Sequence, residues 1–253
     1  TDEVIAVAPT GLPTGFEFLG RYYEDLRALM YGFDQGMAKF RVDWNRTVLE
    51  VQGRAMRVVC EHPMLFAGYI VRDGEVAPEH FFMFENLNGV PLLYVADEKR
   101  WANVGKPLTE ALQAAYKAAG AEDNLVVLRA QRDANDALKG DPQRIAEFVR
   151  RVQRRPMANP FRWRFFRDTM VNALPCDHLA ANFAFEPGVP LEQTAGRLTM
   201  LVTRETFTAE EGEKPVTKIA IDVTEAEGLR LYLSDAIAPL DEPITIVVNG
   251  TTL

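Results

Sequence analysis

Residues 47–59 read TVLEVQGRAMRVV, a short apolar strand followed by a turn and the start of a helix. The strand is rich in Val and Leu with little alternation, which is typical of a strand buried on both faces of a parallel sheet. A turn of the form Gly-x-nucleophile-x-Gly at this place raises a serine above the sheet in many enzymes. Here Gly53 begins the turn, but the residues that follow are Arg54, Ala55, Met56 and Arg57, and none of them is a nucleophile.

The first 150 residues alternate apolar runs with helical patterns. Apolar residues three and four apart predict helices over 19–40 and 108–119, and Asp141-Pro142 is a start signal for a third helix. Strand–helix–strand alternation implies right-handed crossovers and a mostly parallel sheet. The other strand-like runs are VIAVA (4–8), AGYIV (67–71), PLLYVA (91–96) and NLVVLR (124–129).

Beyond the Arg- and Pro-rich stretch at 150–160 the helical patterns stop. Short strands separated by turn residues predict a small antiparallel β domain with a sandwich-like form. We therefore predict two domains, an α/β domain over 1–157 and a β-rich domain over 158–253. The strands expected in the second domain are RLTMLVT (197–203), KIAIDV (218–223), LRLYLS (229–234) and ITIVVN (244–249).

A stretch at the start of the second domain, FRWRF (161–165), alternates aromatic residues with arginines. Arginines among aromatic residues can stack on nucleic-acid bases. The strict alternation favours a half-buried linker strand whose Arg face is solvated or paired with acidic residues.

The overall composition excludes several functions. A formal net charge of −8 argues against a general nucleic-acid binder. No apolar run approaches the 18 residues that a membrane-spanning helix needs. The two cysteines cannot form a disulfide framework, and they leave the cellular compartment open. The only serine in the chain is Ser234, so a serine nucleophile in the first two hundred residues is excluded.

Three segments carry a family likeness. VIAVAPTGLP (4–13), VDWNRTVLEVQGRAMRVVCEHPMLFAGYIVRDG (42–74) and GVPLLYVADEKR (89–100) together resemble the α/β-hydrolase superfamily, with esterase and depolymerase-like members as the nearest likeness. Asp43, Asn45, Arg46 and Gly53 match the frame of the block that leads into the nucleophile helix of that family. The likeness covers roughly residues 1–156, and the β-rich tail resembles an appendage of some bacterial members.

The resemblance implies a catalytic triad whose positions are degenerate in this chain. It places the nucleophile at Ala55, the acid at Arg100 and the histidine at Asn135. A small shift of the alignment makes Asp97 the acid instead. Without a nucleophile and an imidazole, a triad cannot deprotonate and attack. We therefore predict an α/β-hydrolase-like protein that is not an enzyme and that acts in binding or assembly.

One further expectation follows from the resemblance, and a second follows from the residues themselves. The chain begins at the fourth strand of the family, so we expect another chain or an N-terminal region to complete the sheet, and a homo-oligomer is an open alternative. We predict no cofactor and no metal, because Cys176 and His178 share one face of an extended segment but lack further ligands.

Two alternatives stay open. In the first, the protein is a carboxylic-ester or peptidase-like hydrolase with a displaced or partner-completed active site. That site would use Asp97 or His80, because His80 lies in APEHFFMFENL (77–87), just after a strand end. In the second, the chain is the C-terminal part of a longer polypeptide whose N-terminal part holds the function.

Overall fold

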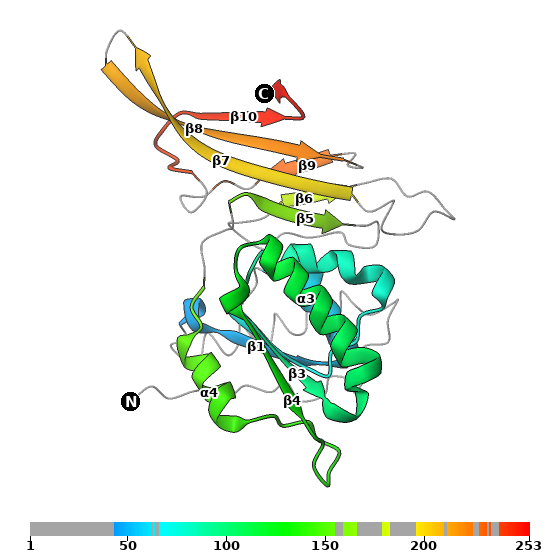
Figure 1. Cartoon of the computed structure of the whole chain (residues 1–253). Helices are drawn as coiled ribbons and strands as arrows, with labels where there is room; N and C mark the ends of the chain where they lie inside the picture. The colour runs from blue at the N-terminus through cyan, green and yellow to red at the C-terminus, as the bar shows by residue number, and fades with distance from the viewer. Residues whose placement is uncertain are drawn as a thin grey trace.

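The computed structural model forms two main sheets (Figure 1). The expected strand at 4–8 and helix at 19–40 lie outside the described residues, as do His62, Cys176 and His178. The residues that the structure describes are 43–61, 63, 66–154, 159–165, 179–182, 196–209, 212–224, 228–231, 233 and 238–253.

The first sheet has four parallel strands in the order β1-β2-β3-β4. It confirms the predicted parallel arrangement of the four apolar runs after residue 43. Because every strand points the same way, all four carboxyl ends lie along one edge of the sheet. The strands are β1 (Val48–Gln52), β2 (Gly68–Arg72), β3 (Leu92–Asp97) and β4 (Leu125–Ala130).

Two of the predicted helices are present with the expected end signals. The helix α3 (Lys106–Ala118) is followed by Gly120, whose φ of 60° only glycine adopts easily. The helix α4 (Pro142–Arg151) begins at Asp141, whose carboxylate accepts hydrogen bonds from two N–H groups of the first turn. The shorter helical segments are η1 (Trp44–Arg46), η2 (Gly53–Ala55), α2 (Met56–Glu61), η3 (Pro78–Leu87), η4 (Glu98–Arg100), η5 (Trp101–Gly105) and η6 (Glu122–Asn124).

Each face of the parallel sheet has its own hydrophobic core. On one face, Tyr69, Leu92 and Tyr94 pack with α2, η3 and α3. On the other face, Leu93 and Val95 pack with Phe148 and Val152 at the end of α4. Successive side chains of a strand point to opposite faces of the sheet, and both faces are buried here. The strand sequences are therefore continuous apolar runs.

Several aromatic residues of η3 and η5 belong to the first core. Phe84 is 1% exposed, and Phe81, Phe82 and Trp101 are partly buried against the same cluster.

The second sheet has five strands in the order β11-β10-β8-β7-β5, and a two-stranded β6–β9 pair accompanies it. The prediction that this sheet is antiparallel is wrong at one place, because β10 pairs parallel with β8. The 20 residues from 224 to 243 give the crossover that parallel neighbours need. The strands are β5 (Phe161–Phe165), β6 (Leu179–Asn182), β7 (Gly196–Ala209), β8 (Gly212–Val223), β9 (Gly228–Leu231), β10 (Ile244–Val248) and β11 (Thr251–Thr252).

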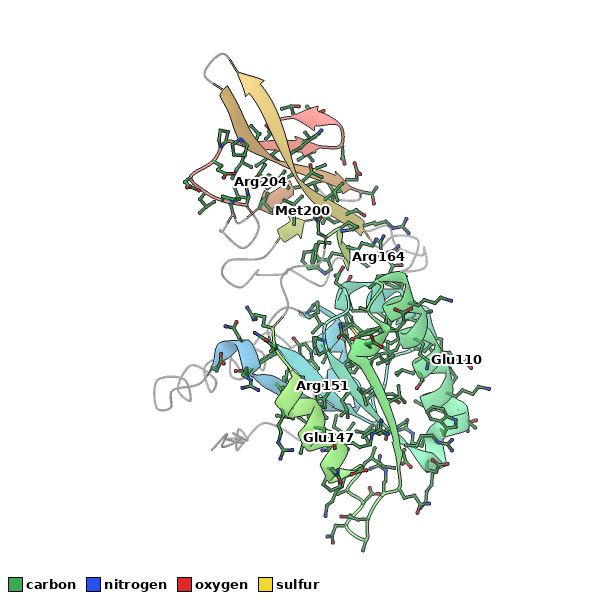
Figure 2. All side chains as sticks on the ribbon, turned by 60° about the vertical axis from the view of Figure 1, so that its left-hand side comes forward. Glu110, Glu147, Arg151, Arg164, Met200 and Arg204 are labelled. Carbon is green, nitrogen blue, oxygen red and sulfur yellow. The ribbon has the colours of Figure 1, made fainter. Side chains whose placement is uncertain are left out.

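One of the two arginines of β5, Arg164, differs from the expectation of a solvated or acid-paired face. Phe161 and Trp163 point into the core of the mixed sheet, as the alternation predicts. Arg162 is exposed, but Arg164 is only 5% exposed. Its guanidinium lies 5.2 Å from the centre of the Phe82 ring, because η3, which lies between strands β2 and β3 of the parallel sheet, packs on this face of β5. Figure 2 shows Arg164 where the two parts of the molecule meet.

All strands of the parallel sheet precede residue 131, and all strands of the mixed sheet follow residue 160. We refer to residues 43–154 as the parallel-sheet unit. The division of the chain into two domains at residue 157 stays a prediction.

Candidate functional site at the carboxyl ends of the parallel strands

The carboxyl edge of the parallel sheet is the place where open α/β sheets bind ligands. Polar and charged residues follow each of the four strands here. Arg54 follows β1, Asp73 follows β2, Asp97 ends β3, and Arg132 follows β4. This edge therefore holds the candidate site, and it contains the region in which the degenerate triad was predicted.

The turn after β1 has an unusual backbone at its first residue. Gly53 has a φ of 59°, and a Cβ atom added to it would meet no atom within 4 Å. Ala55, the predicted nucleophile position, lies two residues later in η2 and does not have a positive φ. The left-handed backbone that marks a sharp strand-to-helix turn thus belongs to a residue with no side chain. Neither Gly53 nor Ala55 offers a nucleophile.

Asp97 and Arg132 form a buried ion pair at the end of β3. Arg132 Nε donates to Asp97 Oδ2 at 2.7 Å, and the Lys99 N–H donates to Asp97 Oδ1 at 2.9 Å. Asp97 is 3% exposed. Burial acts to raise the pKa of the Asp97 carboxyl, but the hydrogen bonds from Arg132 and Lys99 outweigh it, so the pKa lies below the usual range. Asp97 is therefore ionised and fully engaged at neutral pH.

Arg132 also contacts a second carboxylate, that of Asp73, which follows β2. Arg132 Nη2 lies 2.5 Å from Asp73 Oδ2, and Arg100 Nη1 lies 2.7 Å from the same oxygen. Asp73 is 4% exposed. The carboxylate of Asp73 thus joins the arginines that follow β3 and β4.

The contacts extend to the turn after β1. Arg100 Nη2 lies 2.8 Å from Glu75 Oε1, and Arg54 Nε lies 3.6 Å from Glu75 Oε2. One continuous series of contacts therefore crosses all four strand ends. We call it the strand-end ion chain, and its members are Arg54, Glu75, Arg100, Asp73, Arg132 and Asp97.

The strand-end ion chain is electrically balanced. It holds three guanidinium groups and three carboxylates, each with a partner of opposite charge. The hydrogen bond to Asp97 raises the pKa of Arg132, and the hydrogen bond to Glu75 raises the pKa of Arg100. Both arginines therefore stay charged. A general base needs a pKa near the working pH, and neither Asp97 nor these arginines has one.

The hydroxyl of Tyr94 lies close to this chain. It is buried and has no hydrogen-bond partner among the described residues. Burial raises the pKa of Tyr94, and the negative charge of Asp73 raises it further. Tyr94 is therefore a neutral phenol at physiological pH.

The predicted histidine position, Asn135, does not contact Asp97 in the structure. It is exposed in the turn after β4, and its N–H donates to Asp133 Oδ1 at 2.9 Å. The side chain that reaches the acid from this loop is Arg132. Of the predicted site residues, Arg100 and Asp97 are members of the strand-end ion chain, whereas Ala55 and Asn135 are not.

Sequence reasoning missed Arg132 and Asp73. Asp73 lies one position beyond β2 and Arg132 two positions beyond β4, which places them at the carboxyl edge. Opposite charges that follow neighbouring parallel strands are the signal that would have found this pair.

His80, the fallback catalytic candidate, lies in η3 and is half-buried. Its ring packs edge-to-face with Phe82, with ring centres 6.5 Å apart. Burial lowers the pKa of His80, and the positive charge of Arg57 lowers it further. The imidazole is therefore neutral at physiological pH.

Other features of the described residues give no competing site. No group of three or more His, Cys, Asp or Glu side chains within this part of the chain is arranged to hold a metal ion. A cavity of about 580 Å³ lies at the opposite end of the strands. It has mixed charge, and its lining residues are Pro91, Asp123, Asn124, Arg151, Val152, Gln153 and Arg154.

In comparisons with known proteins, no protein-family model and no curated protein matches this chain. The resemblance to α/β-hydrolases therefore stays an expectation from the sequence, which these comparisons do not test. Among the described residues, no helix is long and apolar enough to cross a membrane.

Proposed function

We propose that this chain is an α/β-hydrolase-like protein without catalytic activity, and that it acts in binding or assembly. The observation that supports this best is the contact of Arg132 with Asp97. The resemblance to α/β-hydrolases implies that an active member would have an acid after the third of these strands, and that this acid would orient a histidine from the loop after the fourth. Here an arginine makes that contact at 2.7 Å.

A guanidinium group cannot perform the role of that histidine. Its pKa lies far above physiological pH, so it cannot accept a proton from a nucleophile there. The nucleophile is also missing, because the turn after β1 has glycine at its left-handed position and alanine two residues later. Both partners of the first chemical step are therefore absent from the turn and loop where the family has them.

Binding is the function that the strand-end ion chain allows. Its buried members, Asp73 and Asp97, fix the geometry of Arg132 and Arg100. The side chain of Arg100 is 37% exposed and that of Arg54 is 73% exposed. A partner can therefore reach these two charges of the strand-end ion chain. Charges held in fixed positions contribute to the specificity of a contact.

The expected completion of the sheet also remains a proposal. Within the described residues β1 has one strand neighbour, β2. An unpaired edge at β1 would be open to strand addition. We propose that another chain or the N-terminal region pairs with β1, and that a homo-oligomer is the alternative.

A second candidate is a hydrolase with a displaced site that uses His80. The lowered pKa of His80 supports it, because a neutral imidazole can accept a proton. The geometry favours the first proposal, since the ring contact of His80 is with Phe82 rather than with Asp97.

Hydrolysis of short-chain p-nitrophenyl esters distinguishes the two candidates. The wild-type chain is expected to show no turnover above buffer, and Gly53→Ser and Ala55→Ser are expected to stay inactive while Arg132 is present. Combining each serine variant with Arg132→His tests whether a dyad with Asp97 can be rebuilt. Wild-type turnover that is lost in His80→Ala would overturn the proposal in favour of the displaced site.

A further inference from the structure

The outer edge of β5 is covered by asparagine side chains instead of a strand. Asn86 Nδ2 donates to the Arg164 carbonyl at 2.8 Å, and the Arg164 N–H donates to Asn86 Oδ1 at 2.5 Å. Asn88 Nδ2 donates to the Arg162 carbonyl at 2.6 Å, and the Arg162 N–H donates to Asn88 Oδ1 at 2.9 Å. Four hydrogen bonds thus join the segment after β2 to the edge of a different sheet.

The pattern of these bonds reproduces that of a neighbouring strand. A carboxamide has one C=O acceptor and N–H donors, the same groups as a peptide unit. Two asparagines two residues apart bond to two strand residues two residues apart, which is the spacing of outward-facing groups along a strand. The Asn86–Arg164 half of this pairing is shielded from water, since Asn86 is 1% exposed and Arg164 is 5% exposed, whereas Asn88 is half-buried and Arg162 is exposed. Leaving the shielded groups unpaired would be costly.

We propose that Asn86 and Asn88 act as a side-chain strand that docks the mixed sheet on the parallel-sheet unit and closes the β5 edge. Neighbouring contacts support the docking role. The Arg164 guanidinium lies over the Phe82 ring, and Arg162 Nη1 donates to the Ala118 carbonyl at 3.3 Å. Ala118 ends α3 and Asn88 lies before β3, so the joint is at the amino end of the parallel strands. The carboxyl edge, with the strand-end ion chain, stays clear of it.

Closing this edge also prevents its use by a second copy of the chain. If two β5 strands paired antiparallel about Trp163, Arg162 of each would lie opposite Arg164 of the other. Like charges opposite one another weaken a strand pair. The asparagines therefore make the hydrogen bonds that the N–H and C=O groups at the β5 edge need. A second copy of β5 would make those bonds only with like charges opposite one another.

The chain contains a matched control for this device. Asn249 forms the same pair of bonds with Val223, at 2.8 Å from the Val223 N–H and 3.0 Å to its carbonyl. Both residues of that pair belong to the mixed sheet. Asn249 has a φ of 47° and Asn88 a φ of 45°, so a glycine fits the backbone at either position and removes only the side chain.

Hydrogen exchange on the full-length chain tests the proposal. In Asn88→Gly we expect the Arg162 amide to exchange at least tenfold faster, with a smaller rise at Arg164 as the docking loosens. In Asn249→Gly we expect faster exchange at Val223 only. The double variant Asn86→Ala/Asn88→Gly is expected to unfold in two steps in urea, with the mixed sheet separating from the parallel-sheet unit.

Two results would overturn the proposal. Exchange of the Arg162 and Arg164 amides at wild-type rates in Asn88→Gly would show that the asparagine does not hold the edge. Unfolding of the double variant in one step at the wild-type midpoint would show that the asparagines do not dock the two sheets. Should Asn86→Ala impair folding, Asn88→Gly alone still decides, because Asn88 is only half-buried.

Discussion

Replacing Arg132 by methionine removes the guanidinium that joins two buried carboxylates while keeping an unbranched side chain. Asp97 then retains only the Lys99 N–H as a donor, and it stays 3% exposed. Removing one partner of a buried ion pair costs roughly 3–5 kcal/mol. Asp73 keeps Arg100 as a partner at 2.7 Å, and the Arg132 side chain is 18% exposed, so the lower end applies. We expect Arg132→Met to lower the free energy of unfolding by about 3 kcal/mol.

The matched control is Arg129→Met. Arg129 lies in β4, the same strand that Arg132 follows. Arg129 also pairs with a carboxylate, that of Glu98, but the two side chains are 48% and 37% exposed. Its guanidinium lies 4.8 Å from the Trp101 ring centre. Exposed ion pairs and exposed cation–π contacts each contribute about 1 kcal/mol or less. Arg129→Met should therefore cost clearly less than Arg132→Met.

Urea unfolding at pH 7, followed by far-UV circular dichroism, measures both free energies. The double variant Arg132→Met/Asp97→Asn should recover part of the loss, because it no longer leaves a buried charge without its partner. Equal losses for Arg132→Met and Arg129→Met, or no recovery in the double variant, would refute the argument that burial makes the Arg132 contacts decisive.

Three smaller predictions test individual groups. Because the folded pKa of Asp97 lies below its ordinary value of about 4, its stabilising effect is complete above that pH and is lost as the pH falls through the folded pKa. Urea unfolding between pH 7 and 3 should therefore decline less steeply in Asp97→Asn than in the wild type, and parallel curves would count against it. An NMR titration should place the midpoint of His80 below about 6.5, and Arg57→Ala should raise it, whereas a wild-type midpoint above that value would contradict the effect of burial. Gly53→Ala should cost about 1 kcal/mol from backbone strain alone, as should Gly120→Ala, since a Cβ at either position meets no atom within 4 Å. A much larger loss at Gly53, measured by urea unfolding, would show that the turn after β1 is packed.

The parallel sheet could be predicted from the sequence because local patterns determine it. Strands buried on both faces read as unbroken apolar runs, and the stripe of Leu108, Leu112 and Tyr116 marks the buried face of α3. Asp141 followed by proline gives the start of α4. Each of these signals lies within a few residues of the element that it predicts.

The site could be predicted only in part, because its contacts depend on strand register. Asp97 lies opposite Ala130 in the pairing of β3 with β4, so Arg132 starts two residues beyond the level of Asp97 and folds back to it. An alignment to a family motif places residues along the chain but does not give this register. It therefore located Asp97 near the acid position and gave Asn135 where Arg132 makes the contact.

The errors in the β-rich part also arise from long-range contacts. The alternation in FRWRF predicts a half-buried strand, but the burial of Arg164 depends on docking against Phe82, 82 positions earlier. The parallel pairing of β10 with β8 depends on the path of residues 224–243, which carry no local signal for direction.

We propose that the carboxyl edge of the parallel sheet performs no hydrolysis, because Arg132 holds Asp97 and the turn after β1 has no nucleophile. The most direct test is p-nitrophenyl butyrate hydrolysis by the purified full chain at pH 7 to 8, beside Asp97→Asn and His80→Ala. All three proteins are expected to match the buffer rate. Turnover by the wild type that falls in Asp97→Asn or His80→Ala would contradict the claim and identify this edge as an active site.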